Sequence, residues 1–247
     1  MRTALLVALL VALAACKPEE DQGHAIAIAG AVLIDGAGGP PLTDSMVVVS
    51  GGRIQAAGRR SDLSIPAGAS VLDGGGRYIV PLPIDVTAAG AALPRVSTVA
   101  EAKAVVAGGA SAVVGMVQDQ AGIDPAFLAE LRDLKVVVAP ALVAAGASLE
   151  TAKRNTWRLF QAGVPIAVAA NGQPQRECEL LSDAGIPPLD VIVAATASGA
   201  KALGQAVERG TIQPGKRADL LLLTANPGED VRNLRKVERR MESGEWR

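Results

Sequence analysis

The sequence is poor in three side-chain types on which many functions depend: its 247 residues include one histidine, two cysteines and 2% aromatic residues. With His24 as its single histidine, the chain cannot by itself build a metal site of two or more histidines. It also cannot build a catalytic triad whose base is a histidine outside the N-terminal segment. Two thiols, Cys16 and Cys178, exclude a disulfide scaffold.

The sequence also lacks an excess of charge of either sign, since the formal net charge is −1. Without an excess of positive charge, and with few aromatic rings to stack on bases, the chain does not fit a nucleic-acid binder. The hydrophobic fraction of 49% excludes disorder as the main state. The core must therefore be built from alanine, valine, leucine and isoleucine, which bury less area per residue than aromatic side chains.

An apolar run near the N-terminus is typical of a secretion signal. Arg2 precedes twelve apolar residues at positions 4–15, and Cys16 and a polar stretch follow them. Twelve residues are too few to span a bilayer, which needs about 20, but they suit the apolar core of a signal peptide. The tetrapeptide Leu-Ala-Ala-Cys at 13–16 resembles the lipobox of bacterial lipoproteins. An ordinary secretory signal and a buried helix are the alternatives.

The lipobox resemblance implies that residues 1–15 are a lipoprotein signal peptide, that Cys16 carries the lipid, and that residues 16–24 form a tether. Two or more acyl chains hold a protein stably on a membrane, whereas one chain is marginal. Because Lys17 follows the cysteine, where an aspartate would be associated with the inner membrane, we expect the periplasmic face of the outer membrane. His24 is expected to be a solvated residue of the tether.

The rest of the chain has two kinds of pattern. Short β-type runs broken by glycine and proline fill residues 25–80 and return over residues 206–247, and we expect these two segments to form one composite β-sandwich. Residues 81–205 alternate uniformly apolar runs with helix-length stretches, which predicts parallel strands covered by helices and an α/β fold class. The predicted strands lie near 82–86, 112–117, 135–140 and 165–170.

A glycine cluster after the first β-type run has the form of a dinucleotide-binding loop. Gly36, Gly38 and Gly39 follow a predicted strand, but prolines occupy positions 40 and 41, where the helix of such a loop would begin. Without a helix N-terminus there is no phosphate site of that kind. We therefore predict a turn.

A longer motif, G-x-I-x-x-G-K-x-A-D-L, spans residues 210–220. In it Gly215 permits a turn with positive φ, and Asp219 ends the loop before a buried strand. With the segments VLIDGAGGPPLTDSMVVVSGGRIQAAG and VLDGGGRYIVPLPID, this motif resembles the amidohydrolase superfamily, in particular its imidazolonepropionase-like branch. The resemblance covers about residues 28–89 and 160–240.

The resemblance implies a fold in which a β-sandwich made from both chain ends flanks a (β/α)8, or TIM-like, barrel. In that family the barrel carries one or two divalent metal ions such as zinc, and the enzymes hydrolyse carbon–nitrogen bonds other than peptide bonds. Zinc lowers the pKa of a bound water to near 7 and so supplies the nucleophile.

The metal-binding residues of the family are replaced at both places where the sequences can be aligned. The first barrel strand of the family ends in D-x-H-x-H, whereas here Asp85 is followed by Thr87 and Ala89 at the histidine positions. At the last strand, Asn171 stands where the family has an aspartate that binds metal and shuttles a proton. An amide is neither a base nor an anionic ligand at neutral pH, so we expect no metal cofactor.

The length of residues 81–205 limits the barrel. A strand and its helix take about 30 residues, so these 125 residues hold about four units. A complete barrel needs about 250 residues. We therefore predict about half of a barrel, inserted into the composite sandwich, with the middle strands of the family missing.

Two weaker kinds of site remain. Side chains at the predicted carboxyl ends of the strands offer oxygen ligands that would suit Mg²⁺ or Ca²⁺, but capping and turn roles are the expected ones for all of them. Cys178 is the one thiol of the mature chain, but no histidine is available to activate it, and a buried structural residue is the expected role. The strand-end candidates are Asp85, Thr87, Gln118, Asp119 and Asn171.

The sequence thus favours a lipid-anchored, amidohydrolase-related periplasmic protein that has lost metal-dependent catalysis and acts as a binding, regulatory or assembly subunit. Half a barrel leaves two strand edges to be covered, which predicts a homodimer or a complex with a full-length amidohydrolase. One alternative is a divergent amidohydrolase that cleaves amides or cyclic amides. The other is the product of a decaying gene.

Overall fold

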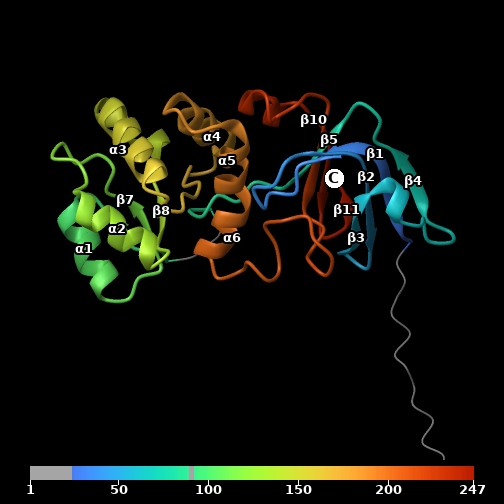
Figure 1. The fold of residues 1–247 in the computed structure, drawn as a ribbon, viewed down its shortest axis with the longest axis horizontal. Coiled ribbons are helices and arrows are strands. Elements are labelled where there is room, and N and C mark those ends of the chain that lie inside the picture. The colour runs from blue at the N-terminus through green and yellow to red at the C-terminus, as the bar shows by residue number, and fades with distance from the viewer. Residues whose placement is uncertain (1–23, 89–91) are drawn as a thin grey trace, which may run out of the picture.

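A computed structural model describes residues 24–88 and 92–247. A large β-sheet lies beside a helix-rich part, and the chain passes from the sheet into the helices and back again (Figure 1). Among the described residues, no helix is both long and apolar enough to cross a bilayer. The predicted signal peptide at 1–15, Cys16 and the tether as far as residue 23 lie outside the described residues.

Eight strands form the large sheet, and they come from both ends of the described chain. Their order is β11-β10-β9-β5-β1-β2-β3, and β4 pairs in parallel with β1. The two ends meet where β5 and β9 pair antiparallel, with Tyr78 opposite Leu223. The strands are β1 Ile26–Leu33, β2 Leu42–Ser50, β3 Arg53–Arg59, β4 Ser70–Asp73, β5 Tyr78–Pro81, β9 Leu220–Leu223, β10 Val237–Glu242 and β11 Glu245–Trp246.

Strand β9 is buried on both faces because it lies between two hydrophobic cores. Leu220 and Leu222 belong to the core inside the large sheet, together with residues of β1 and β2. Leu221 and Leu223 belong to the core shared with the helices. Since successive side chains of a strand point to opposite faces, a strand between two cores must be apolar throughout, which explains the run of four leucines.

The helix-rich part is built on a short parallel sheet, which we call the parallel layer. Its strands β6 (Arg95–Val96), β7 (Ala112–Gly115) and β8 (Val137–Ala139) pair in this order. Two parallel bridges extend the layer, Val138 with Ile166 and Asp85 with Val168. The helices are α1 Val99–Ala107, α2 Pro125–Asp133, α3 Leu149–Gln161, α4 Pro174–Asp183, α5 Pro188–Val193 and α6 Gly199–Ala202.

Each of the four strands predicted for this part contains a paired stretch, but the pairing is shorter than predicted. The stretches near 82–86 and 165–170 are reduced to single bridges at Asp85, Ile166 and Val168. Strand β6 was not predicted, because two residues are too few to give an apolar pattern. The segment that leads to it includes residues 89–91, which lie outside the described residues.

The expectation of two open strand edges is wrong at one of them, because the chain covers it. Ile84 donates its N–H to the carbonyl of Ala195, at 2.7 Å, and that carbonyl belongs to the π-helical turn Ala194–Ser198 before α6. Gly199 lies so close that a Cβ there would stand 3.1 Å from the Cβ of Ile84. Ile84, Asp85 and Val86 are accordingly buried.

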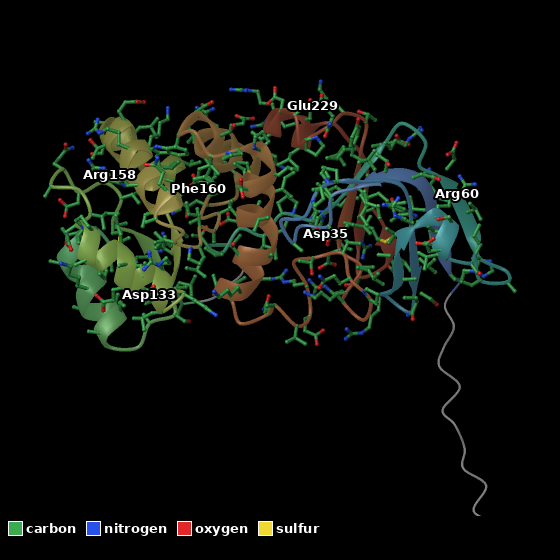
Figure 2. The ribbon with its side chains drawn as sticks, in the orientation of Figure 1. Asp35, Arg60, Asp133, Arg158, Phe160 and Glu229 are labelled. Atoms are coloured by element: carbon green, nitrogen blue, oxygen red, sulfur yellow. The ribbon has the colours of Figure 1, made fainter. Side chains whose placement is uncertain are left out.

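The glycine cluster at 36–39 forms a turn, as predicted, and no helix follows it before β2. The carboxylate of Asp35 accepts a hydrogen bond from the N–H of Ala37 at 2.8 Å, which closes the turn. The turn lies at the junction between the large sheet and the helices (Figure 2). Gly36 has φ +80° and touches Pro81, Thr196 and the carbonyl of Gly210, so it fits where a larger residue does not.

Replacing Gly36 with alanine should destabilise the junction. An added Cβ would lie 2.7 Å from Cγ of Pro81 and 2.8 Å from Oγ1 of Thr196, in a backbone conformation that disfavours side chains. We expect the free energy of unfolding to fall by about 3 kcal/mol, measured by urea denaturation. In Gly39→Ala, where nothing lies within 4 Å, the change should stay within about 0.5 kcal/mol. Equal effects of the two substitutions would contradict this account of the junction.

Candidate functional site

Asp85 is the centre of a cluster at the end of the parallel layer. Its Oδ1 accepts hydrogen bonds from the N–H of Thr87 (2.9 Å), the hydroxyl of Thr87 (2.6 Å) and the N–H of Ala170 (3.0 Å). Its Oδ2 accepts one from the N–H of Gly172 at 2.7 Å. Only 8% of the residue is exposed, so these four bonds replace most of the water that an ionised carboxylate would otherwise bind.

Thr87 and Asn171 join the same cluster, though in different ways. The Thr87 hydroxyl donates to Asp85 and accepts a hydrogen bond from the backbone N–H of Asn171 at 3.0 Å. Asn171 itself is exposed and has a positive φ of 46°. It therefore contributes a backbone donor and a turn, while its amide faces solvent. Ala89 lies outside the described residues.

These hydrogen bonds set the charge state of Asp85. Burial raises the pKa of its carboxyl, but the hydrogen bonds from the Thr87 hydroxyl and from the N–H groups of Ala170, Gly172 and Thr87 lower it by more. The pKa is therefore below its usual value of 3.8. At neutral pH Asp85 is an anion that is hydrogen-bonded at both oxygens.

A second buried carboxylate, Glu177 in the first turn of α4, is not among the residues predicted from the sequence. It accepts hydrogen bonds from the N–H groups of Leu142 and Val143, each at 2.7 Å, and it has no exposed surface. It thereby fixes the loop after β8 to α4. One signal was available: Glu177 precedes the buried Leu180 and Leu181 by three and four residues, which puts it on the apolar face of the helix.

Burial changes the titration of Glu177 and of its neighbour Cys178. Desolvation raises the pKa of Glu177 from 4.5 to about 7, although the two backbone N–H groups oppose this and the charge of Asp85 adds to it. Desolvation likewise raises the pKa of the Cys178 thiol to about 12, with further increases from Glu177 and Glu179. Cys178 is fully buried and protonated at neutral pH, so it is placed as a structural residue.

The remaining strand-end candidates lie elsewhere, after β7. The Asp119 carboxylate accepts hydrogen bonds from the N–H of Val99 at the start of α1 (3.2 Å) and of Ala121 (3.0 Å). Its own carbonyl accepts from the Asn155 side chain of α3 at 2.9 Å. Gln118 is half-buried in the same turn. In the described chain, no hydrogen bond or ion pair joins Asp119 to the cluster at Asp85.

The donor set at the strand ends does not fit a catalytic metal. Both oxygens of Asp85 and both of Glu177 are occupied by backbone N–H groups. Thr87 and the exposed amide of Asn171 add neutral oxygens only. No three residues of the types His, Cys, Asp or Glu come together over residues 24–88 and 92–247 in an arrangement that could hold an ion.

Comparison with known proteins identifies related folds. Residues 166–245 match the model of the amidohydrolase family. Molinate hydrolase is similar in structure, with a TM-score of 0.78, 13% identity and coverage of 92% of this chain and 95% of that one. A. niger ochratoxinase is also similar, with a TM-score of 0.69, 14% identity and coverage of 91% of this chain and 96% of that one. A Xaa-Pro dipeptidase with bound methionine in its active site has a TM-score of 0.73, 13% identity and coverage of 90% of this chain and 99% of that one. At such identities the likeness concerns the fold alone. No curated protein sequence matches the chain.

Replacing Asp85 with asparagine should lower the free energy of unfolding at pH 7 by about 3 kcal/mol. The amide nitrogen of asparagine would face the N–H of Gly172 or of Ala170, and a buried donor would lose its acceptor. Because the folded pKa of Asp85 is lowered, its stabilisation is present above the unfolded value of 3.8 and is lost as the pH falls through the folded value. The difference in unfolding free energy between the wild type and Asp85→Asn, measured by urea denaturation, should therefore become smaller below pH 4. The exposed Asp133→Asn is the control, and a fully stable Asp85→Asn would refute the role of the cluster.

Glu177 should make the protein less stable as the pH rises from 4.5 to 7. Its pKa is raised in the fold, so the folded state binds the proton more tightly over this range, and ionisation near pH 7 costs about 3 kcal/mol relative to the unfolded chain. In Glu177→Gln the plot of unfolding free energy against pH should lose this slope, whatever its absolute stability. The same plot for the exposed Glu150→Gln should keep the slope. Parallel curves for the wild type and Glu177→Gln would show that the glutamate stays ionised.

Proposed function

The chain is related to the amidohydrolase family, and on this basis we propose that it is a lipid-anchored assembly subunit that has given up metal-dependent hydrolysis. The observation that carries the proposal is the hydrogen bonding of Asp85. The carboxylate at the end of the first predicted barrel strand accepts four hydrogen bonds from its own chain, three at Oδ1 and one at Oδ2. It belongs to no group of three His, Cys, Asp or Glu side chains that could hold an ion within residues 24–88 and 92–247.

The architecture in this proposal is about half of a barrel attached to a sandwich made from both chain ends. The order β6, β7, β8 and the bridges at Ile166 and Asp85 support it, because they give one run of parallel strands with helices between them. Cys16 is the proposed site of lipidation, and the periplasmic face of the outer membrane is the proposed location. No divalent metal is part of the mature protein in this proposal.

The proposed partner binds at the edge of β6 that pairs with no other strand of the described residues, and a second copy of the chain is the first candidate. The carbonyls of Pro94 and Val96 accept hydrogen bonds from Val114 of β7 and from Met116, just after it. Since the N–H and C=O of one residue point to the same side of a strand, those of Arg95, between the two, point away from β7. An outward-facing backbone pair is a template for another strand. A full-length amidohydrolase that supplies this strand is the second candidate.

The experiment that tests the proposal is native mass spectrometry of the purified protein in mild detergent, after incubation with Zn²⁺ or Mn²⁺. The expected result is a dimer without tightly bound metal, and no hydrolysis of N-acyl amino acids or cyclic amides. Arg95→Pro, which removes the outward N–H, should reduce the dimer to a monomer, whereas Arg95→Lys, which keeps it, should not.

The outcomes distinguish the competing functions. One or two metal ions per chain, together with hydrolysis that a chelator abolishes, would show a divergent amidohydrolase and overturn the proposal. A wild-type monomer that recovers no full-length amidohydrolase after mild crosslinking would also overturn the assembly role. If circular dichroism of the wild type showed no cooperative thermal transition, this would favour the hypothesis that the chain is the product of a decaying gene.

A further inference from the structure

An open groove of about 560 Å³ lies between α1, the loop after β7 and α3. Its volume falls in the range of small-molecule sites. It is separate from the cluster at Asp85, since none of that cluster's residues lines it. Its walls contain apolar residues, two basic residues and two acidic residues. The apolar ones are Val99, Ala100, Ala121, Ile123 and Pro125, the basic ones Lys103 and Arg158, and the acidic ones Asp119 and Asp124.

Three of the four charges are already engaged within the chain. Lys103 pairs with Asp124 at 2.8 Å and stands over the ring of Phe127, 5.4 Å from its centre. Asp124 also accepts the N–H of Phe127 at 3.0 Å, where it caps α2. Asp119 accepts the two backbone N–H groups described above. The hydrogen bonds of both aspartates are thus directed at their own chain.

Arg158 is the charge that remains. Among the hydrogen bonds, ion pairs and ring contacts of the described residues, none involves its side chain. It lies on α3 and reaches over the loop after β7 (Figure 2). Gly122, with φ +75°, makes room for it, because a Cβ there would stand 2.8 Å from Nη1 of Arg158. The loop thus leaves space beside Gly122 for a guanidinium that has no hydrogen-bond or ion-pair partner among residues 24–88 and 92–247.

We propose that this groove binds a small organic carboxylate with an apolar tail. The planar fork of Arg158 matches a carboxylate in two parallel hydrogen bonds, and the tail lies along Val99 and Pro125. Asp119, which is in no ion pair among the described residues, disfavours a doubly charged anion such as phosphate more than a singly charged carboxylate. A neutral amide of the same shape lacks the charge that Arg158 needs.

The test is a titration of the full chain, in mild detergent and labelled with ¹⁵N, with hexanoate as the probe and hexanamide and inorganic phosphate as comparisons. We expect hexanoate to bind with a Kd of about 1 mM, and to shift the amide signals of Ala100, Ala121 and Gly122. Phosphate and hexanamide should bind at least about tenfold more weakly.

Matched variants assign the effect to the groove. Arg158→Ala should weaken hexanoate binding by about tenfold or more, Arg158→Lys should weaken it less, and the exposed Arg154→Ala on the same helix should not change it. Ala100→Leu, which narrows the groove without changing charge, should also weaken binding. Shifts that persist in Arg158→Ala, shifts confined to other parts of the protein, or equal binding of hexanamide would overturn the proposal. All variants should keep the amide spectrum of the folded chain.

Discussion

A buried carboxylate needs hydrogen-bond donors in place of water, and the parallel layer is arranged so that Asp85 has donors at both oxygens. The bridge from Asp85 to Val168 is a single pairing, too short to hold two strands on its own. The side chain supplies what the backbone pairing lacks, because it binds the N–H groups of Ala170 and Gly172 just beyond the bridge. The segments around Asp85 and Val168 are thus joined by the side chains of Asp85 and Thr87 as well as by the backbone bond from Val86 to Val168.

Glu177 likewise accepts hydrogen bonds from backbone N–H groups at the end of a strand, in this case the neighbouring strand β8. It receives the N–H groups of Leu142 and Val143, which follow β8, from its place at the start of α4. Two carboxylates therefore close the ends of neighbouring strands by binding backbone donors that have no helical or sheet partner. The effect of the fold on ionisation differs between the two carboxyl groups. Asp85 is stabilised as an anion, whereas the deeper burial of Glu177 opposes its charge.

The sequence predicted the parts of the fold that have a strong local pattern. The apolar runs at 112–117 and 135–140 contain β7 and β8, and the prolines after Gly39 excluded a helix at the glycine turn. Asp85, Thr87 and Asn171 were predicted as candidates because they lie at the carboxyl ends of predicted strands. The structure brings these three together, but through the backbone of Asn171 and not through its amide.

Other features depend on contacts between distant segments, and no local pattern carries them. The edge at Ile84 is covered because Gly199, more than 100 residues later, allows a helix to approach it. Arg158 is without a partner among the described residues because Asp124 pairs with Lys103 and Asp119 binds backbone groups. Which charged side chains are paired depends on neighbours in the folded structure, and neither composition nor sequence spacing specifies those neighbours.

The antiparallel pairing of β5 with β9 also affects how the protein comes to be made. Pro81 lies opposite Leu220, so about 140 residues separate the two strands in the order of synthesis. Early strands of the large sheet are complete long before their partner emerges, and until then β5 offers an unpaired edge to other chains. The sheet closes last, which makes its formation slow relative to the local helices. The nascent chain therefore passes through a period in which it depends on protection from aggregation.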